Sequence, residues 1–211
     1  MSVELHPSAR WITTASGASV LLDRPDPASL QLSDMAHALG QIPRYCGHAR
    51  RPYSVAEHSI LVAQIIEAAY PDARGNPHAG LAALMHDAHE AYIGDLSTPA
   101  KGILGEPWAL YEERMQRAVR TRYGLHQAAV HWAPILQAAD RIALATERAQ
   151  LLPDGPLWPC LMHVQPMYGI DLMAPERCAM TWQDWACRWA DEVEGAMAAR
   201  AAMSHPVEQH A

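Results

Sequence analysis

The stretch LAALMHDAHEAYIGDLSTPAK, residues 81–101, most constrains what this chain can fold into, because it sets many ionisable groups in an apolar segment. Its apolar residues recur with helical spacing, and Gly94 supplies the positive-φ residue that commonly ends a helix. The ionisable groups near that end are His86, Asp87, His89, Glu90 and Asp95. Charges in so apolar a helix are costly to bury unless they are paired or bound to a metal. We therefore expect either a functional cluster or a solvated helix end with a hydrogen-bonded histidine.

Length and composition indicate one domain without membrane or secretory segments. The chain has 211 residues, 50% of them hydrophobic, which suits a single domain over residues 1–203 and a disordered tail over 204–211. No apolar run reaches the length of a membrane span, and the N-terminus lacks the features of a secretory signal. We expect a cytoplasmic protein. Its four cysteines form no C-x-x-C pair and are expected to be free and partly buried.

The charge balance excludes one class of partner. The net charge is −7 with histidine neutral, and the sequence contains no basic stripe or polybasic tail. Because phosphate neutralisation dominates binding to DNA and RNA, a long nucleic acid is not expected as a partner. A small anion held by a few arginines remains compatible with this composition.

Periodicity predicts an all-α fold with a small N-terminal β-hairpin. Two short β-type runs flank Ser16-Gly17 within residues 11–22, and Ser33 and Asp34 are placed to cap a short helix that ends at Gly40. Capping boxes at Ser54/Glu57 and Thr181/Asp184 mark two further helix starts. Proline marks helices that begin at Pro77, Pro107 and Pro134, whereas residues 96–106 read as a loop. A stripe of Trp182, Trp185 and Trp189 is typical of a core or of a subunit contact.

Two ionisable residues interrupt apolar helical stripes elsewhere in the chain. His58 lies between Val55 and Leu61, where a lone histidine is more often a hydrogen-bonded core residue than a ligand. Asp140 lies in a similar stripe, and a buried aspartate in mid-helix is rare without a cation or a donor. Glu147, two turns further on, could line the same face as Asp140 or be solvated, and the solvated reading is favoured.

Together these residues occur in the order His58, His86-Asp87, Asp140. Two imidazoles and two carboxylates suit a divalent cation of borderline hardness. The motifs SVAEHS, LMHDAHEAYIGDLSTPAK and AADRIALATE resemble the HD-domain metal-dependent phosphohydrolase superfamily, and within it the bacterial 5′-deoxynucleotidases and their phage relatives. The resemblance covers about residues 40–150. It implies a helical bundle in which these four side chains bind one divalent ion, with Co, Mn, Zn, Fe, Ni and Mg left open.

The resemblance also implies roles for residues around the metal. Glu90 and Asp95 match residues that, in family members, orient or activate the attacking water and protonate the leaving oxygen. Arg44 matches an arginine that contacts the substrate phosphate. Thr98 and Lys101, in the segment after Asp95, are further candidates for substrate binding.

Three functional readings follow. The first is a 5′-deoxynucleotidase that hydrolyses deoxynucleoside monophosphates. The second is a deoxynucleoside triphosphate triphosphohydrolase that uses the same site, because the N-terminal segment and Arg50-Arg51 look more like phage HD hydrolases. The third is a nucleotide sensor that keeps the fold without turnover. Beside these three stands a non-functional alternative, a structural scaffold whose histidine and aspartate only pair with each other.

Two further points concern the resemblance. His89 departs from the small residue common in the nucleotidases, and the resemblance makes a homodimer plausible.

Overall fold

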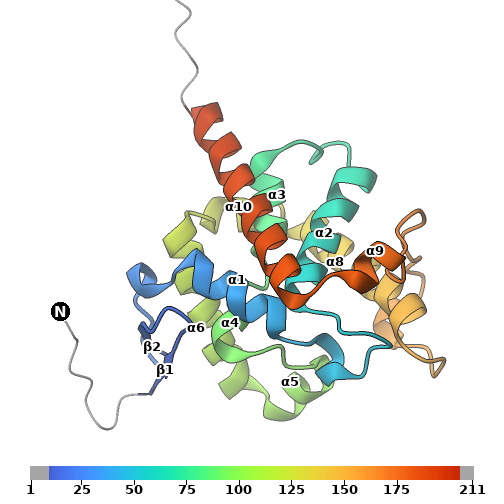
Figure 1. Ribbon diagram of the computed structural model, residues 1–211, viewed down its shortest axis with the longest axis horizontal. Coiled ribbons are helices and arrows are strands. Elements are labelled where there is room, and N and C mark those ends of the chain that lie inside the picture. Colours follow the sequence, from blue (N-terminus) through green and yellow to red (C-terminus); the bar gives the residue numbers. More distant parts are fainter. Residues whose placement is uncertain (1–9, 205–211) are drawn as a thin grey trace, which may run out of the picture.

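The computed structural model describes residues 10–204 and has the expected all-α fold with an N-terminal hairpin (Figure 1). Strands β1 (Trp11–Thr13) and β2 (Ser19–Leu21) form the hairpin. The helices are α1 (Leu32–Gln41), α2 (Val55–Ala69), α3 (Pro77–Leu84), α4 (Glu90–Ile93), α5 (Thr98–Leu104), α6 (Glu106–Tyr123), α7 (His126–His131), α8 (Ala133–Leu151), α9 (Pro175–Ala179) and α10 (Trp182–Ser204). Residues 205–211 of the predicted disordered tail lie outside the described part of the chain.

The hairpin is fastened to α1 by a buried aspartate. β1 and β2 are antiparallel, with Ile12 opposite Val20. The backbone N–H and the hydroxyl of Ser16 in the turn each donate to the Asp34 carboxylate at 2.8 Å. The prediction that Asp34 caps α1 is therefore wrong, because the helix begins earlier, at Leu32, and Asp34 lies inside it with 4% exposure.

Helix α2 is the central element, buried along most of its length. Ser54 caps it as predicted, accepting from the Glu57 backbone N–H at 3.3 Å. Its first half packs in a core cluster shared with α1 and α10, and its second half packs in a cluster shared with α8. Because α2 contacts other helices on several sides, nearly every residue in its first three turns is buried.

The tryptophan stripe of α10 belongs to the core. The Thr181/Asp184 capping box starts this helix as predicted, since Thr181 donates to the Asp184 carboxylate and the Asp184 N–H returns to the Thr181 hydroxyl. Helix α10 packs across α1 and α3 (Figure 1). Trp185 is 4% exposed and Trp189 is fully buried, and the indole N–H of Trp189 donates to the Leu84 carbonyl at 2.8 Å.

The helix predicted to begin at Pro77 and to carry His86 is interrupted. Regular helix ends at Leu84, residues 85–89 form turns, and α4 starts at Glu90. In a continuous helix the Leu84 carbonyl would accept from the Ala88 N–H, but it accepts from Trp189 instead, and Ala88 turns back to Met85 at 3.2 Å. A tertiary contact thus redirects one helical hydrogen bond.

The prediction of a loop over residues 96–106 is also wrong, because this segment contains α5. Pro99 stands in the first turn of this helix, a position that proline favours and that the sequence already offered as a signal. No residue of α5 is buried. Gly94 before it and Gly105 after it both have positive φ, at 82° and 62°.

Two expectations about the surface can also be compared with the structure. All four cysteines are free, as predicted, but all four are exposed rather than partly buried. Among residues 10–204, no helix combines the length and the apolar character needed to cross a membrane.

Candidate metal centre

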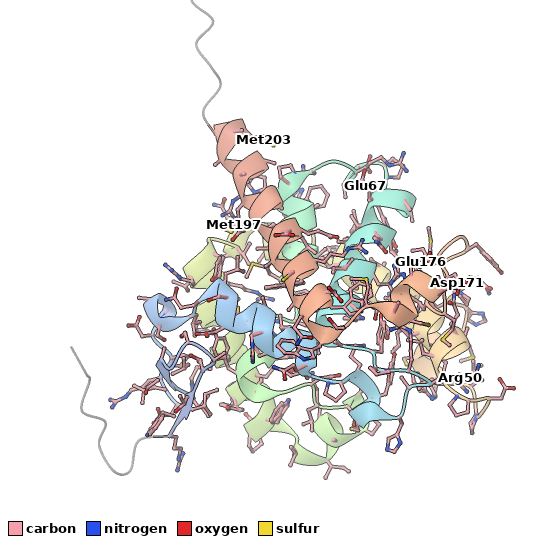
Figure 2. All side chains as sticks on the ribbon, viewed as in Figure 1. Arg50, Glu67, Asp171, Glu176, Met197 and Met203 are labelled. Atoms are coloured by element: carbon pink, nitrogen blue, oxygen red, sulfur yellow. The ribbon has the colours of Figure 1, made fainter. Side chains whose placement is uncertain are left out.

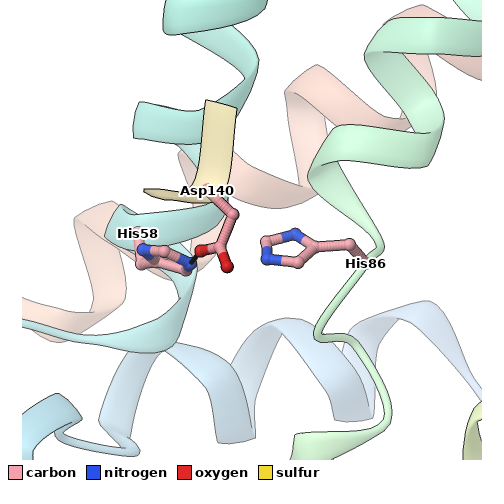
Figure 3. A group of neighbouring side chains, drawn as sticks. All are labelled: His58, His86 and Asp140. Atoms are coloured by element: carbon pink, nitrogen blue, oxygen red, sulfur yellow. Dashed lines mark ion pairs between the residues drawn. The ribbon is translucent and has the colours of Figure 1, made fainter. Parts of the chain in front are cut away.

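Three elements bring the predicted ligands together. His58 comes from α2, His86 from the turn after α3 and Asp140 from α8, and Figure 3 shows the three side chains converging. One ligand atom of each lies within 4.8 Å of the others, and His58 Nε2 is 3.2 Å from Asp140 Oδ1. The fourth predicted ligand, Asp87, is not part of this group of three, but its Oδ2 lies 3.1 Å from His86 Nε2 and 3.6 Å from His58 Nε2.

The interruption after α3 explains how two consecutive residues join one site. In a regular helix adjacent side chains point about 100° apart, so His86 and Asp87 would not share a face. They lie instead in the turn of residues 85–89, where the backbone no longer imposes helical directions. The contact between Trp189 and Leu84 is therefore part of what assembles the cluster.

Both histidines direct Nε2 toward the cluster and use Nδ1 for a hydrogen bond outside it. His58 Nδ1 lies 2.6 Å from Glu147 Oε1, and His86 Nδ1 lies 2.7 Å from the Ala83 carbonyl oxygen. An ionised carboxylate and a carbonyl can only accept, so each Nδ1 carries a proton and donates it. Each Nε2 is buried without a hydrogen-bond partner. This arrangement, with an outer acceptor orienting each imidazole, is typical of histidines that bind metals.

Glu147 is the functional residue that the sequence prediction got wrong. It was expected to be solvated, but it is fully buried on α8, two turns after Asp140. Its carboxylate accepts from the hydroxyls of Tyr45 and Tyr53, the latter at 2.8 Å, and lies 3.4 Å from an Arg44 guanidinium nitrogen. The spacing of seven residues from Asp140 had placed it on the correct helix face, but a buried tertiary environment was not visible in that spacing.

The electrostatics of the cluster keep its carboxylates ionised. Burial opposes ionisation of Asp87, but His86 and His58 outweigh it and hold the pKa of this carboxyl well below its usual range. Burial is likewise outweighed at Asp140, whose pKa is lowered by the nearby His58 imidazole. Burial and the Arg44 charge oppose protonation of His58, yet Glu147 and Asp140 raise its pKa to about 10. Burial also opposes protonation of His86, and the Asp87 carboxylate outweighs it and raises the pKa of this imidazole.

Asp140 is more exposed than expected, because the apolar residues around it in the sequence had predicted a buried side chain. Its side chain is 45% exposed, whereas His58 is fully buried. The cluster is therefore closed on the side of α2 and reachable by solvent on the side of α8.

Glu90, Asp95 and Arg44 lie beside the cluster. Glu90 is 3% exposed, and burial together with the negative charges of Asp87 and Asp95 raises its pKa to about 10. Burial also raises the pKa of Asp95. An Arg44 guanidinium nitrogen lies 3.9 Å from Asp87 and 4.0 Å from Asp95. Arg44 comes from the 3-10 turn Arg44–Gly47, in which the next residue, Tyr45, has a positive φ of 56°.

The two substrate-binding candidates on α5 are not joined to this cluster by direct contact. Thr98 is exposed at the first position of the helix. The Lys101 ammonium lies 2.6 Å from a carboxylate oxygen of Glu112 on α6. Nearby, His89 is buried at 3% exposure, with Nε2 3.5 Å from the same Glu112 oxygen.

The two arginines that had suggested a triphosphate substrate lie outside the cluster. Arg50 is exposed at the periphery of the molecule (Figure 2). Arg51 pairs with the buried Glu57 through two contacts of 2.7 Å and also donates to the Leu172 carbonyl. Arg177 adds a third contact to Glu57 at 2.9 Å.

The residues present fit a divalent cation. Two buried imidazole nitrogens lack hydrogen-bond partners, and both face ionised carboxylates. Mixed nitrogen and oxygen donors of this kind suit first-row transition metals. The group of His58, His86 and Asp140 could therefore hold one metal ion, with the Asp87 carboxylate beside it.

Comparison with known proteins places the chain among relatives in two bacteria. No protein-family profile matches it. The uncharacterized protein RCAP_rcc00048 of Rhodobacter capsulatus is 37% identical over 150 residues, covering 67% of this chain and 72% of that protein. YfdR of Escherichia coli (strain K12), also described as uncharacterized, is 34% identical over 168 residues, covering 78% of this chain and 87% of YfdR. Identity at this level over most of both chains shows that this protein belongs to the same family as YfdR.

Proposed function

We propose that this protein is a metal-dependent phosphohydrolase that cleaves the 5′ phosphoester of deoxynucleoside monophosphates. The observation that carries the proposal is the pair of buried Nε2 atoms on His58 and His86, which lack partners and face Asp87 and Asp140. The order of these four residues in the sequence is the one that resembles HD-domain phosphohydrolases. A divalent cation held there would supply Lewis acidity toward the phosphoryl oxygens.

Arg44 would bind the phosphate. Its guanidinium lies close to Asp87 and Asp95, at the edge of the cluster. Although burial opposes its charge, Glu147 and the neighbouring acidic groups raise the pKa of Arg44, so it is a permanent cation. A planar guanidinium suits bidentate contact with a phosphate and would neutralise the charge that develops on it.

Glu90 and Asp95 would move the protons. A carboxyl group with a raised pKa is a stronger base once ionised and a usable acid while protonated. Burial and two neighbouring carboxylates raise the pKa of Glu90 in this way. A divalent cation in the cluster would favour the ionised form of Glu90, which would then take the proton from the attacking water. Asp95, whose pKa is also raised, would give a proton to the departing 5′ oxygen of the nucleoside.

The hydrogen bonds of Arg51 favour a monophosphate substrate over a triphosphate substrate. A triphosphate carries additional negative charge, which needs further cations at the site. Arg51 is committed to Glu57 and to the Leu172 carbonyl, so it is not available to supply one. Triphosphohydrolase activity is therefore the second candidate, at the same site.

The test is a product analysis. Metal-loaded protein is incubated with a panel of deoxynucleoside mono- and triphosphates, and the products are separated by chromatography. We expect nucleoside and orthophosphate from monophosphates alone. Nucleoside together with intact triphosphate would replace the first candidate by the second.

The same assay separates an enzyme from a binding protein. If metal-loaded protein retains nucleotides in equilibrium dialysis but forms no product from either class, the phosphohydrolase proposal fails and a nucleotide sensor takes its place. Absence of bound metal in the purified, metal-incubated protein would contradict the phosphohydrolase proposal. It would leave a metal-free nucleotide sensor, or a structural pairing of the histidines and aspartates.

A further inference from the structure

A second group of potential ligands lies beside the first and has no part in holding its metal. His89 and Glu90 stand at the start of α4, and Glu112 faces them from α6. One ligand atom of each lies within 4.8 Å of the others. His89 is the residue that departs from the nucleotidase pattern in the sequence, so its position here needs a physical explanation.

Two members of this group carry buried polar atoms without partners. His89 and Glu90 are each 3% exposed, and neither His89 Nδ1 nor Glu90 Oε2 has a hydrogen-bond partner. Leaving a buried polar atom unsatisfied lowers the stability of the fold, and more so for a charged group. Such atoms are rare in folded proteins and call for a missing ligand or ion.

The only cation of the described residues in direct contact with this group is Lys101. Its ammonium lies 2.6 Å from Glu112 Oε1, and its side chain is 32% exposed. Lys101 belongs to α5, which buries none of its residues and is bounded by Gly94 and Gly105, both with positive φ and open space around them. A lysine on so weakly packed a helix can withdraw toward solvent without disturbing the core.

We propose that His89, Glu90 and Glu112 form a second divalent-cation site, for which the Lys101 ammonium is a built-in competitor. One imidazole and two carboxylates suit Mn²⁺, Fe²⁺ or Zn²⁺. The inference goes beyond the proposed function, because it concerns cation binding and holds whether or not the protein turns over nucleotides. A cation at this position would lie against the Glu90 carboxylate, one oxygen of which has no hydrogen-bond partner.

The experiment counts bound Mn²⁺ by equilibrium dialysis and elemental analysis over a range of free Mn²⁺. We expect the unmodified protein to show a tight class of one ion and a weaker class of one ion. Glu112→Gln, which keeps the shape of the side chain, should lose the weaker class alone. Lys101→Met should tighten the weaker class by at least about tenfold, because a competing positive charge is removed at contact distance.

Two further variants make the outcome decisive. Glu113→Gln alters the next residue of α6, which is exposed and paired with Arg117, and should leave both classes unchanged. Asp140→Asn should lose the tight class and keep the weaker one, so failure of the first site does not obscure the second. A single bound Mn²⁺ in Lys101→Met, or two in Glu112→Gln, would overturn the proposal.

Discussion

Two adjacent residues of α2, Glu57 and His58, are both fully buried, but they lie in opposite kinds of environment. The Glu57 carboxylate receives two hydrogen bonds from Arg51 and one from Arg177, all at 2.9 Å or less. His58 has one ring nitrogen satisfied by Glu147 and the other buried without a partner, facing two carboxylates.

This difference in pairing distinguishes a structural network around Glu57 from a functional one around His58. A buried charge that is fully paired stabilises its fold only when every member is present. A buried donor set that is left incomplete lowers stability and persists where a ligand completes it. Glu57 should therefore matter for folding and His58 for binding, although they are neighbours on one helix.

The largest effect is expected from Asp87→Ala. Removing this carboxylate should abolish retention of the tightly bound metal ion and lower turnover of a deoxynucleoside monophosphate by at least about a thousandfold, since several kcal/mol of transition-state stabilisation are lost with the cation. Elemental analysis and a phosphate-release assay measure both quantities. Asp191→Ala, at an exposed position of α10, is the control and should leave both unchanged. Full metal occupancy in Asp87→Ala would remove Asp87 from the ligand set.

The next effect is expected on folding. Glu57→Gln should lower the free energy of unfolding by about 3–5 kcal/mol, because Arg51 and Arg177 lose the charge that they share in a buried position. Urea denaturation measures this, and metal content should stay as in the unmodified protein. Glu192→Gln removes one partner of the exposed Arg188 pair and should cost about 1 kcal/mol or less. Equal costs for the two variants would erase the distinction between paired burial and a surface pair.

Metal removal is expected to give a smaller change in stability. A cation that binds only the folded state contributes about 2.7 kcal/mol at a free concentration one hundred times its dissociation constant. For a protein of this size, chelation should then lower Tm by roughly 5–10 °C. Scanning calorimetry with and without chelator measures the shift, and any shift in Asp87→Ala should be much smaller, because only the weaker cation site remains. A shift of the same size in Asp87→Ala would place the stabilising ion elsewhere.

Glu147 connects the two kinds of environment, because it is fully paired yet orients a ligand. Glu147→Gln should weaken metal affinity by about 10–100-fold, as is typical when the outer partner of a metal-binding histidine is altered. Competition with a chromogenic chelator measures this affinity. Tyr53→Phe removes one donor to Glu147 and leaves the carboxylate on His58, so its effect should be much smaller. A larger loss in Tyr53→Phe would assign the orientation of His58 to the tyrosine.

The smallest effect concerns an exposed charge, Asp184, in the capping box of α10. Hydrogen bonds from Thr181 lower the pKa of this carboxyl from its ordinary value of 3.8. A lowered pKa means that the stabilisation is present above pH 4 and is lost as the pH falls through the folded-state value. The small difference in Tm between the unmodified protein and Asp184→Asn should therefore be present at pH 7 and fade toward pH 3. A difference that stays constant over this range would show that the charge of Asp184 contributes nothing.

Much of the fold could be predicted because its signals are local. Capping residues and prolines marked the starts of α2, α3, α6, α8 and α10, and each lies within two residues of the expected position. Helix α5 carried the same proline signal, but the segment was predicted to be a loop, and its apolar residues Ile103 and Leu104 are exposed in the structure. Local signals fail where a short helix packs against little else.

For the candidate site, the sequence by itself determined which residue types are available and on which helices His58, Asp140 and the segment around His86 would lie. Spacing could not join His86 to Asp87 or bury Glu147. Only the tertiary structure decided these points, because the Trp189 indole takes the Leu84 carbonyl out of the helical ladder and α8 packs Glu147 against α2. These contacts join residues 105 and 89 positions apart, which no local pattern encodes.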